Sequence, residues 1–113
     1  MSEKAGRVIR VNCDTGRFIT DIQQLTCLPF VESRDIKRVR DMADSLMLDG
    51  LLNPIVVWRS LHDLYLLDGY VRCFAFNYLR GRYGCTIPKI PVIEKWPTSM
   101  REAERMVAWL NER

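Results

Sequence analysis

The sequence lacks any hydrophobic run long enough to cross a membrane and contains very little histidine. No stretch approaches the roughly 18 apolar residues of a membrane span, and no signal-peptide pattern precedes the polar N-terminus. His62 is the only histidine, and no CxxC pair occurs among Cys13, Cys27, Cys73 and Cys85. These absences exclude a recognisable zinc motif, so we expect a soluble cytoplasmic protein with free thiols, no membrane contact and no metal site of its own.

Length and composition indicate one compact domain spanning residues 1–113. The chain is 48% hydrophobic and 27% charged, which allows a real core, and residues 1–7 are polar and predicted to be disordered. The net charge of +3 is too small to indicate a nucleic-acid partner. A cluster of basic residues fits equally well a solvated helix face or a nucleic-acid patch, and it consists of Arg34, Lys37, Arg38 and Arg40.

Hydrophobic periodicity and turn residues predict a small mixed α/β fold, with helices on a small sheet. Before residue 50 we expect a hairpin of 8–11 and 17–22, a loop over 25–34, and a helix capped by Ser33 or Asp35 and ended by Gly50. The apolar face of that helix is predicted to include Ile36. Beyond it we expect buried strands at 55–58 and 64–67, a helix over 70–82, a strand over 87–95 that its prolines keep to an edge or entry position, and a C-terminal helix over 98–111.

The turn Asp68-Gly69 joins a predicted strand to a predicted helix, and this arrangement is typical of phosphate binding. Backbone N–H groups point outward at a helix N-terminus, where the helix dipole favours negative charge. Arg72 lies in the first helical turn, where a cation opposes the dipole, so its presence argues for an anion nearby. Asp68 fits an N-cap best, and alternatively a base or a ligand for a divalent metal.

The order of these elements carries a family resemblance. From Phe18 to about Lys95 the chain resembles the ParB/sulfiredoxin-like superfamily, and the stand-alone "nuclease-like" ParB N-terminal domains in particular. The matching segments are a helix at 40–46, the run Gly50-Leu51-Leu52-Asn53-Pro54-Ile55-Val56-Val57, the turn Leu67-Asp68-Gly69-Tyr70-Val71-Arg72, and a strand from Ile87 to Ile93. The resemblance implies a small fold whose glycine turn and arginine bind nucleotide phosphates. Its members include partition proteins that bind and hydrolyse CTP, ATP-using sulfiredoxins and free-serine kinases.

The chain departs from two branches of this superfamily. Tyr70 stands where sulfiredoxins carry their reactive cysteine, so sulfiredoxin chemistry is not expected. Tyr70 and Val71 also replace the glutamate and the further arginine of partition proteins, so CTP hydrolysis does not carry over. After the matching region we expect one helix and no helix-turn-helix.

The candidate site follows from the turn and from the resemblance. The candidate phosphate- or nucleotide-binding residues are Gly69, Tyr70, Arg72, Asn53 and Arg34. Asp68 and Glu32 are the candidate catalytic residues, and Lys37, Arg38 and Arg40 form the candidate nucleic-acid patch. The cofactor is unknown, with a nucleotide and Mg²⁺ as one candidate. Trp96, which precedes Pro97, is more typical of packing, with stacking on a base as the alternative.

Three hypotheses for the function remain open. The first is a module that binds nucleotide or nucleic-acid phosphates in the DNA transactions of a plasmid, virus or other mobile element. The second is a nucleotide-dependent phosphotransferase or hydrolase that uses Asp68 and Arg72. The third is an interaction protein that kept the fold and lost the site, and the C-terminal helix then offers a surface for a homodimer.

Overall fold

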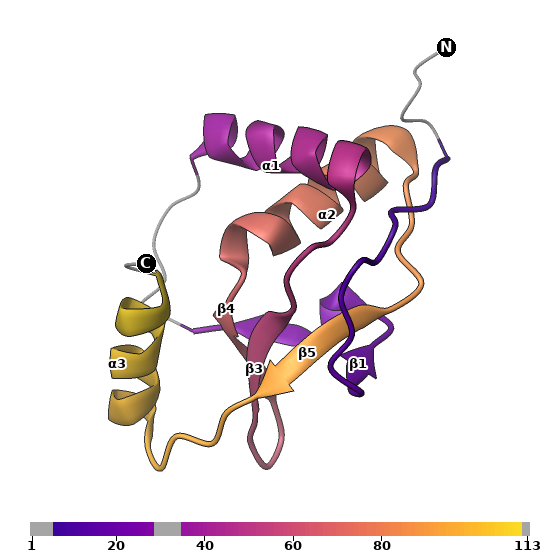
Figure 1. Cartoon of the computed structure of the whole chain (residues 1–113). Helices are drawn as coiled ribbons and strands as arrows, with labels where there is room; N and C mark the ends of the chain where they lie inside the picture. The colour runs from indigo at the N-terminus through magenta and orange to yellow at the C-terminus, as the bar shows by residue number, and fades with distance from the viewer. Residues whose placement is uncertain (1–5, 29–34, 112–113) are drawn as a thin grey trace.

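A mixed five-stranded sheet organises the structure, which is a computed structural model describing residues 6–28 and 35–111. The strands are β1 (Phe18–Ile19), β2 (Leu25–Cys27), β3 (Ile55–Arg59), β4 (Leu64–Asp68) and β5 (Ile90–Glu94), in the order β1-β5-β3-β4-β2. The pairs β1–β5 and β3–β4 are antiparallel, whereas β3–β5 and β2–β4 are parallel. The three central strands, β5, β3 and β4 (Figure 1), carry fully buried apolar side chains, as expected for strands covered on both faces: Ile55, Val57, Leu66, Leu67 and Ile90.

Three α-helices cover this sheet: α1 (Ile36–Asp49), α2 (Tyr70–Tyr83) and α3 (Met100–Asn111). Figure 1 shows α1 and α2 lying together above the sheet, with α3 beside β4 at the left. Both α1 and α2 begin on the side where α3 ends (Figure 1). Two helix N-termini therefore meet near the junction between β4 and α2, which brings the positive ends of two helix dipoles to one region.

The helix ends follow the predicted capping chemistry. The Asp35 carboxylate accepts from the backbone N–H groups of Lys37 (3.0 Å) and Arg38 (3.4 Å), and Gly50 ends α1. At α3 the Ser99 hydroxyl accepts from the Glu102 N–H at 3.2 Å. The Glu102 carboxylate accepts in return from the Thr98 N–H at 2.9 Å. This is a capping box whose second hydrogen bond comes from the residue before the capping serine instead of from the serine itself. Ile36, predicted to face inward, is instead 65% exposed.

The N-terminal third differs from the prediction. Val8 and Val11 form single parallel bridges with Thr86 and Leu51, so residues 8–11 and 17–22 do not pair as a hairpin. Part of the predicted loop, residues 25–27, is strand β2. A contact with β4, distant in sequence, decides its conformation, and the local composition therefore did not reveal it.

Two further elements refine the expectations. β5 lies between β1 and β3 rather than at an edge, and its Pro91 is accommodated because Val92 donates the ladder hydrogen bond to the Arg17 carbonyl (3.0 Å). Gly6, which was predicted to be disordered, donates to the Tyr83 carbonyl at 2.7 Å, and residues 1–5 lie outside the described part of the chain. Across residues 6–28 and 35–111, none of the helices has the length and apolar character needed to span a membrane.

Candidate functional site

The junction between β4 and α2 contains a bulge directly before Asp68. Val56 pairs with Asp68, whereas the neighbouring Val57 pairs with Leu66, so Leu67 is an extra residue on β4. Bulges of this kind change the direction of the side chains that follow and occur often beside binding sites. Asp68 ends the strand and is 9% exposed, and Gly69 then begins the helix. The chain thus passes from the centre of the sheet to a helix N-terminus within two residues.

Gly69 is required at this junction by the packing of the backbone. Its φ of 109° lies in the left-handed region, which side chains rarely adopt. A Cβ atom at this position would also lie 2.6 Å from Cγ2 of Ile55 on β3. The glycine therefore lets the start of α2 approach the sheet closely, which explains its presence without reference to a ligand.

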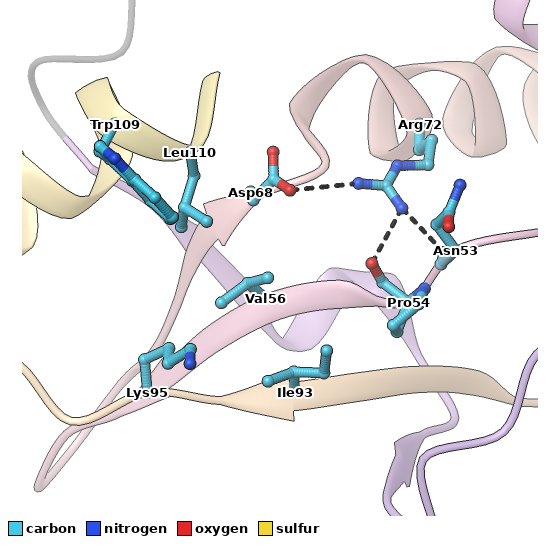
Figure 2. A pocket seen from close by; sticks show the side chains of 9 residues that line it. All are labelled: Asn53, Pro54, Val56, Asp68, Arg72, Ile93, Lys95, Trp109 and Leu110. Atoms are coloured by element: carbon cyan, nitrogen blue, oxygen red, sulfur yellow. Dashed lines mark hydrogen bonds and ion pairs between the residues drawn. The ribbon is translucent and has the colours of Figure 1, made fainter. Parts of the chain in front are cut away.

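Arg72 clamps the start of α2 to the segment that precedes β3 (Figure 2). Its Nη1 donates to the carbonyl oxygens of Asn53 (2.7 Å) and Pro54 (2.9 Å). Its Nη2 lies 3.5 Å from Oδ2 of Asp68, and both side chains are largely buried, at 16% and 13% exposure. The guanidinium thus links α2 to the backbone at Asn53–Pro54 and to the carboxylate at the end of β4, and a structural role for Arg72 is evident before any ligand is considered.

The structure corrects the expected role of Asp68. The N-cap of α2 is Gly69. Asp68 is instead the last residue of β4, and its carboxylate is paired with Arg72. Tyr70 is also placed differently from a ligand contact. Its side chain is buried, its hydroxyl donates to the Leu66 carbonyl, and burial raises the pKa of the phenol. The residue as a whole is only 7% exposed.

A pocket of about 500 Å³ lies between the sheet and α3, with the Asp68–Arg72 pair in its wall (Figure 2). Val56 and Ile93 supply apolar surface from β3 and β5. Lys95 follows β5 and adds a second cation, and Trp109 and Leu110 line the pocket from α3. Asn53 also lines it, and is exposed.

A second pocket, of about 240 Å³, is also lined by this ion pair. Gly69, Tyr70 and Val71, the first residues of α2 with its cap, line this pocket together with Arg38 of α1. The two pockets share Asp68, Arg72 and Leu110. The site therefore consists of a larger, partly apolar pocket next to a smaller pocket at a helix N-terminus.

The structure separates the candidate nucleic-acid patch into individual residues. Arg38 lines the smaller pocket. Lys37 instead forms an ion pair with Asp41 at 2.9 Å on the solvent side of α1, and Arg40 is exposed and lines neither pocket. Glu32 and Arg34 lie outside the described residues, so their predicted roles remain predictions.

Sequence reasoning placed neither Lys95 nor Trp109 at the site, although both line the larger pocket. Lys95 follows a strand and Trp109 lies on the predicted helix over 98–111, so neither belongs to a recognisable motif. The only local signal at Trp109 is a large aromatic residue displaced from the apolar stripe of Ala103, Val107 and Leu110. Their meeting depends on how α3 packs beside β4, which sequence spacing does not show.

No group of three or more His, Cys, Asp or Glu side chains suited to a metal occurs in the part of the chain that the structure describes. Among the described residues, Asp68 is the acidic side chain that lines both pockets. The four cysteines are free thiols; Cys73 and Cys85 are buried and Cys27 is exposed. Burial raises the pKa of the Cys73 thiol to about 12, which is the opposite of what a nucleophilic cysteine needs.

Solved structures resemble this arrangement across most of the chain. The chromosome-partitioning protein ParB from Caulobacter crescentus, complexed with CTP-gamma-S, matches with a TM-score of 0.63 at 19% identity, over 86% of this chain and 53% of that one. The same protein complexed to the centromeric parS site matches with a TM-score of 0.58 at 18% identity, over 85% of this chain and 46% of that one. Sulfiredoxin from Arabidopsis thaliana matches with a TM-score of 0.55 at 21% identity, over 81% of this chain and 94% of that one.

The chain has a ParB/sulfiredoxin-like fold. This confirms the predicted fold class, with a small sheet and helices in one arrangement. The chain spans about half the length of the ParB structures that it matches. No protein-family model matches the sequence, and no curated protein matches it. Because a ParB/sulfiredoxin-like fold serves different chemistries, the function has to be argued from the site.

Proposed function

We propose that this domain binds a nucleotide by its phosphates at the N-terminal turn of α2, and that it acts in DNA transactions of a plasmid, virus or other mobile element. The observation that carries the proposal is the smaller pocket, where the start of α2 meets Arg38 of α1. Backbone N–H groups in the first turn of a helix have no partner within the helix, and the helix dipole adds positive potential there. Arg38 adds a full positive charge from a second element.

The roles of the motif residues follow from their contacts. Gly69 allows the backbone to approach the sheet, and Arg72 fixes the first turn of α2 against Asn53 and Pro54. Both residues thus act mainly by holding the backbone N–H groups of the first turn of α2 in position. Preorganised donors of this kind bind anions well because little ordering is required at the moment of binding.

The DNA context of the proposal rests on likeness. ParB from Caulobacter crescentus, whose fold this chain shares, has been solved complexed with CTP-gamma-S and complexed to parS. The alternative of a phosphotransferase or hydrolase has less geometric support. One of its two candidate catalytic residues, Asp68, is paired with Arg72, and the other, Glu32, lies outside the described residues.

The test is calorimetric titration of the whole chain with CTP, ATP and tripolyphosphate, each with and without Mg²⁺. We expect binding of at least one nucleotide and of tripolyphosphate. Arg38→Ala should weaken it about tenfold, because one charge-assisted contact contributes roughly 1.5 kcal/mol. The matched control is Arg40→Ala, since Arg40 is an exposed arginine of the same helix that lines neither pocket. Its affinity should equal that of the unchanged chain.

Two results would overturn the proposal. One is the absence of binding for all these ligands, confirmed by thermal shift, because a ligand at a hundred times its Kd adds about 2.7 kcal/mol of stability. The other is binding to duplex or single-stranded DNA alone, with a steep salt dependence and equal losses in Arg38→Ala and Arg40→Ala. That pattern would indicate that the arginines of α1 contact the phosphate backbone of DNA and that the protein has no nucleotide pocket.

A further inference from the structure

We infer that the larger pocket receives a nucleobase, stacked on the indole of Trp109, while the phosphate groups of the same ligand reach the N-terminal turn of α2. This inference rests on the proposed function and specifies the orientation of the ligand. It assigns a binding role to Trp109 and Lys95, which belong to no motif of the sequence.

The sizes of the two pockets indicate a ligand with two different parts. Small-molecule sites have volumes of roughly 300–1,000 Å³, and the larger pocket, at about 500 Å³, lies within this range. The smaller pocket, at about 240 Å³, lies below that range and suits a compact anion. Both pockets are lined by Asp68, Arg72 and Leu110, so they lie next to each other, and we treat them as the two subsites of one ligand.

Trp109 is exposed to solvent on α3. Its neighbours on the inner face of α3 are almost fully covered, with Ala103 at 0% and Leu110 at 9% exposure, whereas Trp109 is 68% exposed. Figure 2 shows its indole on the α3 side of the pocket, with Lys95 and Ile93 on the β5 side. A single exposed aromatic residue is ordinary, but this one faces a pocket that also carries charged groups.

The remaining lining matches a planar heterocycle attached to phosphate. Ile93 is 39% exposed and Val56 lies beside it, so apolar surface is available to one face of a base. Lys95 and Arg72 supply hydrogen-bond donors, and Asp68 supplies an acceptor, for the polar edge of a base or its sugar. Stacking on an aromatic side chain tolerates every base because each has a π face, so this contact alone does not select one nucleotide.

A free nucleotide and the end of a single strand of DNA present the same chemistry, a base joined to phosphate. The experiment therefore includes both sources. Calorimetry with CTP, ATP, tripolyphosphate and a short single-stranded DNA is performed on the unchanged chain, Trp109→Ala and Trp96→Ala. Trp96 is the matched control, because it is 67% exposed and lines neither pocket.

We expect Trp109→Ala to weaken nucleotide binding about tenfold or more, the fold-change that loss of one stacking contact produces. Tripolyphosphate has no base, so its affinity should be unchanged in Trp109→Ala. Trp96→Ala should bind all ligands as the unchanged chain does. Trp109→Phe keeps an aromatic face and should recover most of the lost affinity. The same pattern with single-stranded DNA in place of the nucleotides would support the stacking contact and identify a strand end as the source of the base.

Equal nucleotide affinities for Trp109→Ala and Trp96→Ala would overturn this inference while leaving the proposed function intact, provided that tripolyphosphate binds. An equal loss of tripolyphosphate and nucleotide affinity in Trp109→Ala, with its thermal unfolding unchanged, would also contradict a role confined to the base. Failure of the unchanged chain to bind any of these ligands would instead remove the proposed function itself. Thermal unfolding of each variant shows that the comparison is made between folded proteins.

Discussion

Replacing Arg72 by methionine should destabilise the domain as well as its site. The change keeps much of the apolar stem and removes the guanidinium that joins α2 to the Asn53–Pro54 segment. Arg72 donates to two carbonyl groups, at 2.7 and 2.9 Å, and pairs with Asp68 at 3.5 Å. Because Arg72 and Asp68 are only 16% and 13% exposed, water replaces these contacts poorly in the variant.

The expected loss is about 3 kcal/mol of unfolding free energy. Hydrogen bonds from a charged donor contribute roughly 1.5–3 kcal/mol each, and removing one partner of a buried pair costs roughly 3–5 kcal/mol. These values overlap, and Asn53 is exposed, so its carbonyl regains water in the variant and the sum is smaller than the parts. Domains of this size have a stability of about 5–15 kcal/mol, so Arg72→Met should still fold.

Urea denaturation of Arg72→Met, followed by circular dichroism, measures this loss. Arg80→Met is the matched control, because Arg80 is an exposed arginine of the same helix whose Nη2 donates to Asn77 at 3.2 Å. It should lose no more than about 0.5 kcal/mol, as is usual for surface positions. Adding Asp68→Asn to the unchanged chain and to Arg72→Met completes a double-mutant cycle and isolates the coupling between the side chains of Arg72 and Asp68.

One outcome would contradict the clamping role of Arg72. In it, Arg72→Met unfolds at the same urea concentration as Arg80→Met and loses all binding of tripolyphosphate. Arg72 would then act as a ligand contact and not as a clamp. The same observation would make the buried ion pair with Asp68 energetically silent.

Two further predictions concern the backbone and the buried ionisable groups. Gly69→Ala should lower the free energy of unfolding by at least about 1–2 kcal/mol, because the new Cβ meets Ile55 at a positive φ. Gly81→Ala, which has open space inside α2, should instead raise it by about 0.5–1 kcal/mol. Denaturation curves that shift in the same direction for both variants would contradict the assigned packing. Burial raises the pKa of Cys73 from 9.0 to about 12 and also raises that of Tyr70, so both groups remain protonated in the folded state while they ionise in the unfolded state. The stability that Cys73 contributes is therefore present below about pH 9, its unfolded-state pKa, and is lost as the pH rises above that value. The loss from Tyr70 begins about one pH unit higher, because its ordinary pKa is 10.0. Each loss amounts to at most about 1.4 kcal/mol per pH unit. Unfolding measured from pH 8 to 11 should show a shallower decline in Cys73→Ala, and an equal decline would contradict the burial of this thiol.

Much of the fold was predictable because its main elements carry local signals. The helix α1 begins at the capping residue Asp35 and ends at Gly50, and the strand at Ile55 has an uninterrupted apolar run. The single bridges of Val8 and Val11 were not predictable, because each depends on a partner far along the chain. For the same reason β2, three residues long, was mistaken for a loop.

The sequence singled out the turn between β4 and α2 as the candidate site, but it did not reveal the contacts that the residues of this turn make. The turn at Gly69 was recognised, but the clash that makes glycine necessary involves Ile55, which no local pattern indicates. The predicted capping role of Asp68 was wrong, because its carboxylate pairs with Arg72. Arg38 reaches the site only because α1 packs on α2 with both helices starting on the same side (Figure 1), which is a tertiary fact.

The central claim is that the first turn of α2 binds phosphate. Amide chemical shifts, followed by nuclear magnetic resonance during a titration with tripolyphosphate, test it most directly. We expect the largest shifts at the backbone N–H groups of Gly69, Tyr70 and Val71, with saturation at one equivalent of tripolyphosphate. These shifts should be lost in Arg38→Ala. Shifts confined to the exposed basic residues of α1, or the absence of any saturable shift at residues 69–71, would contradict it.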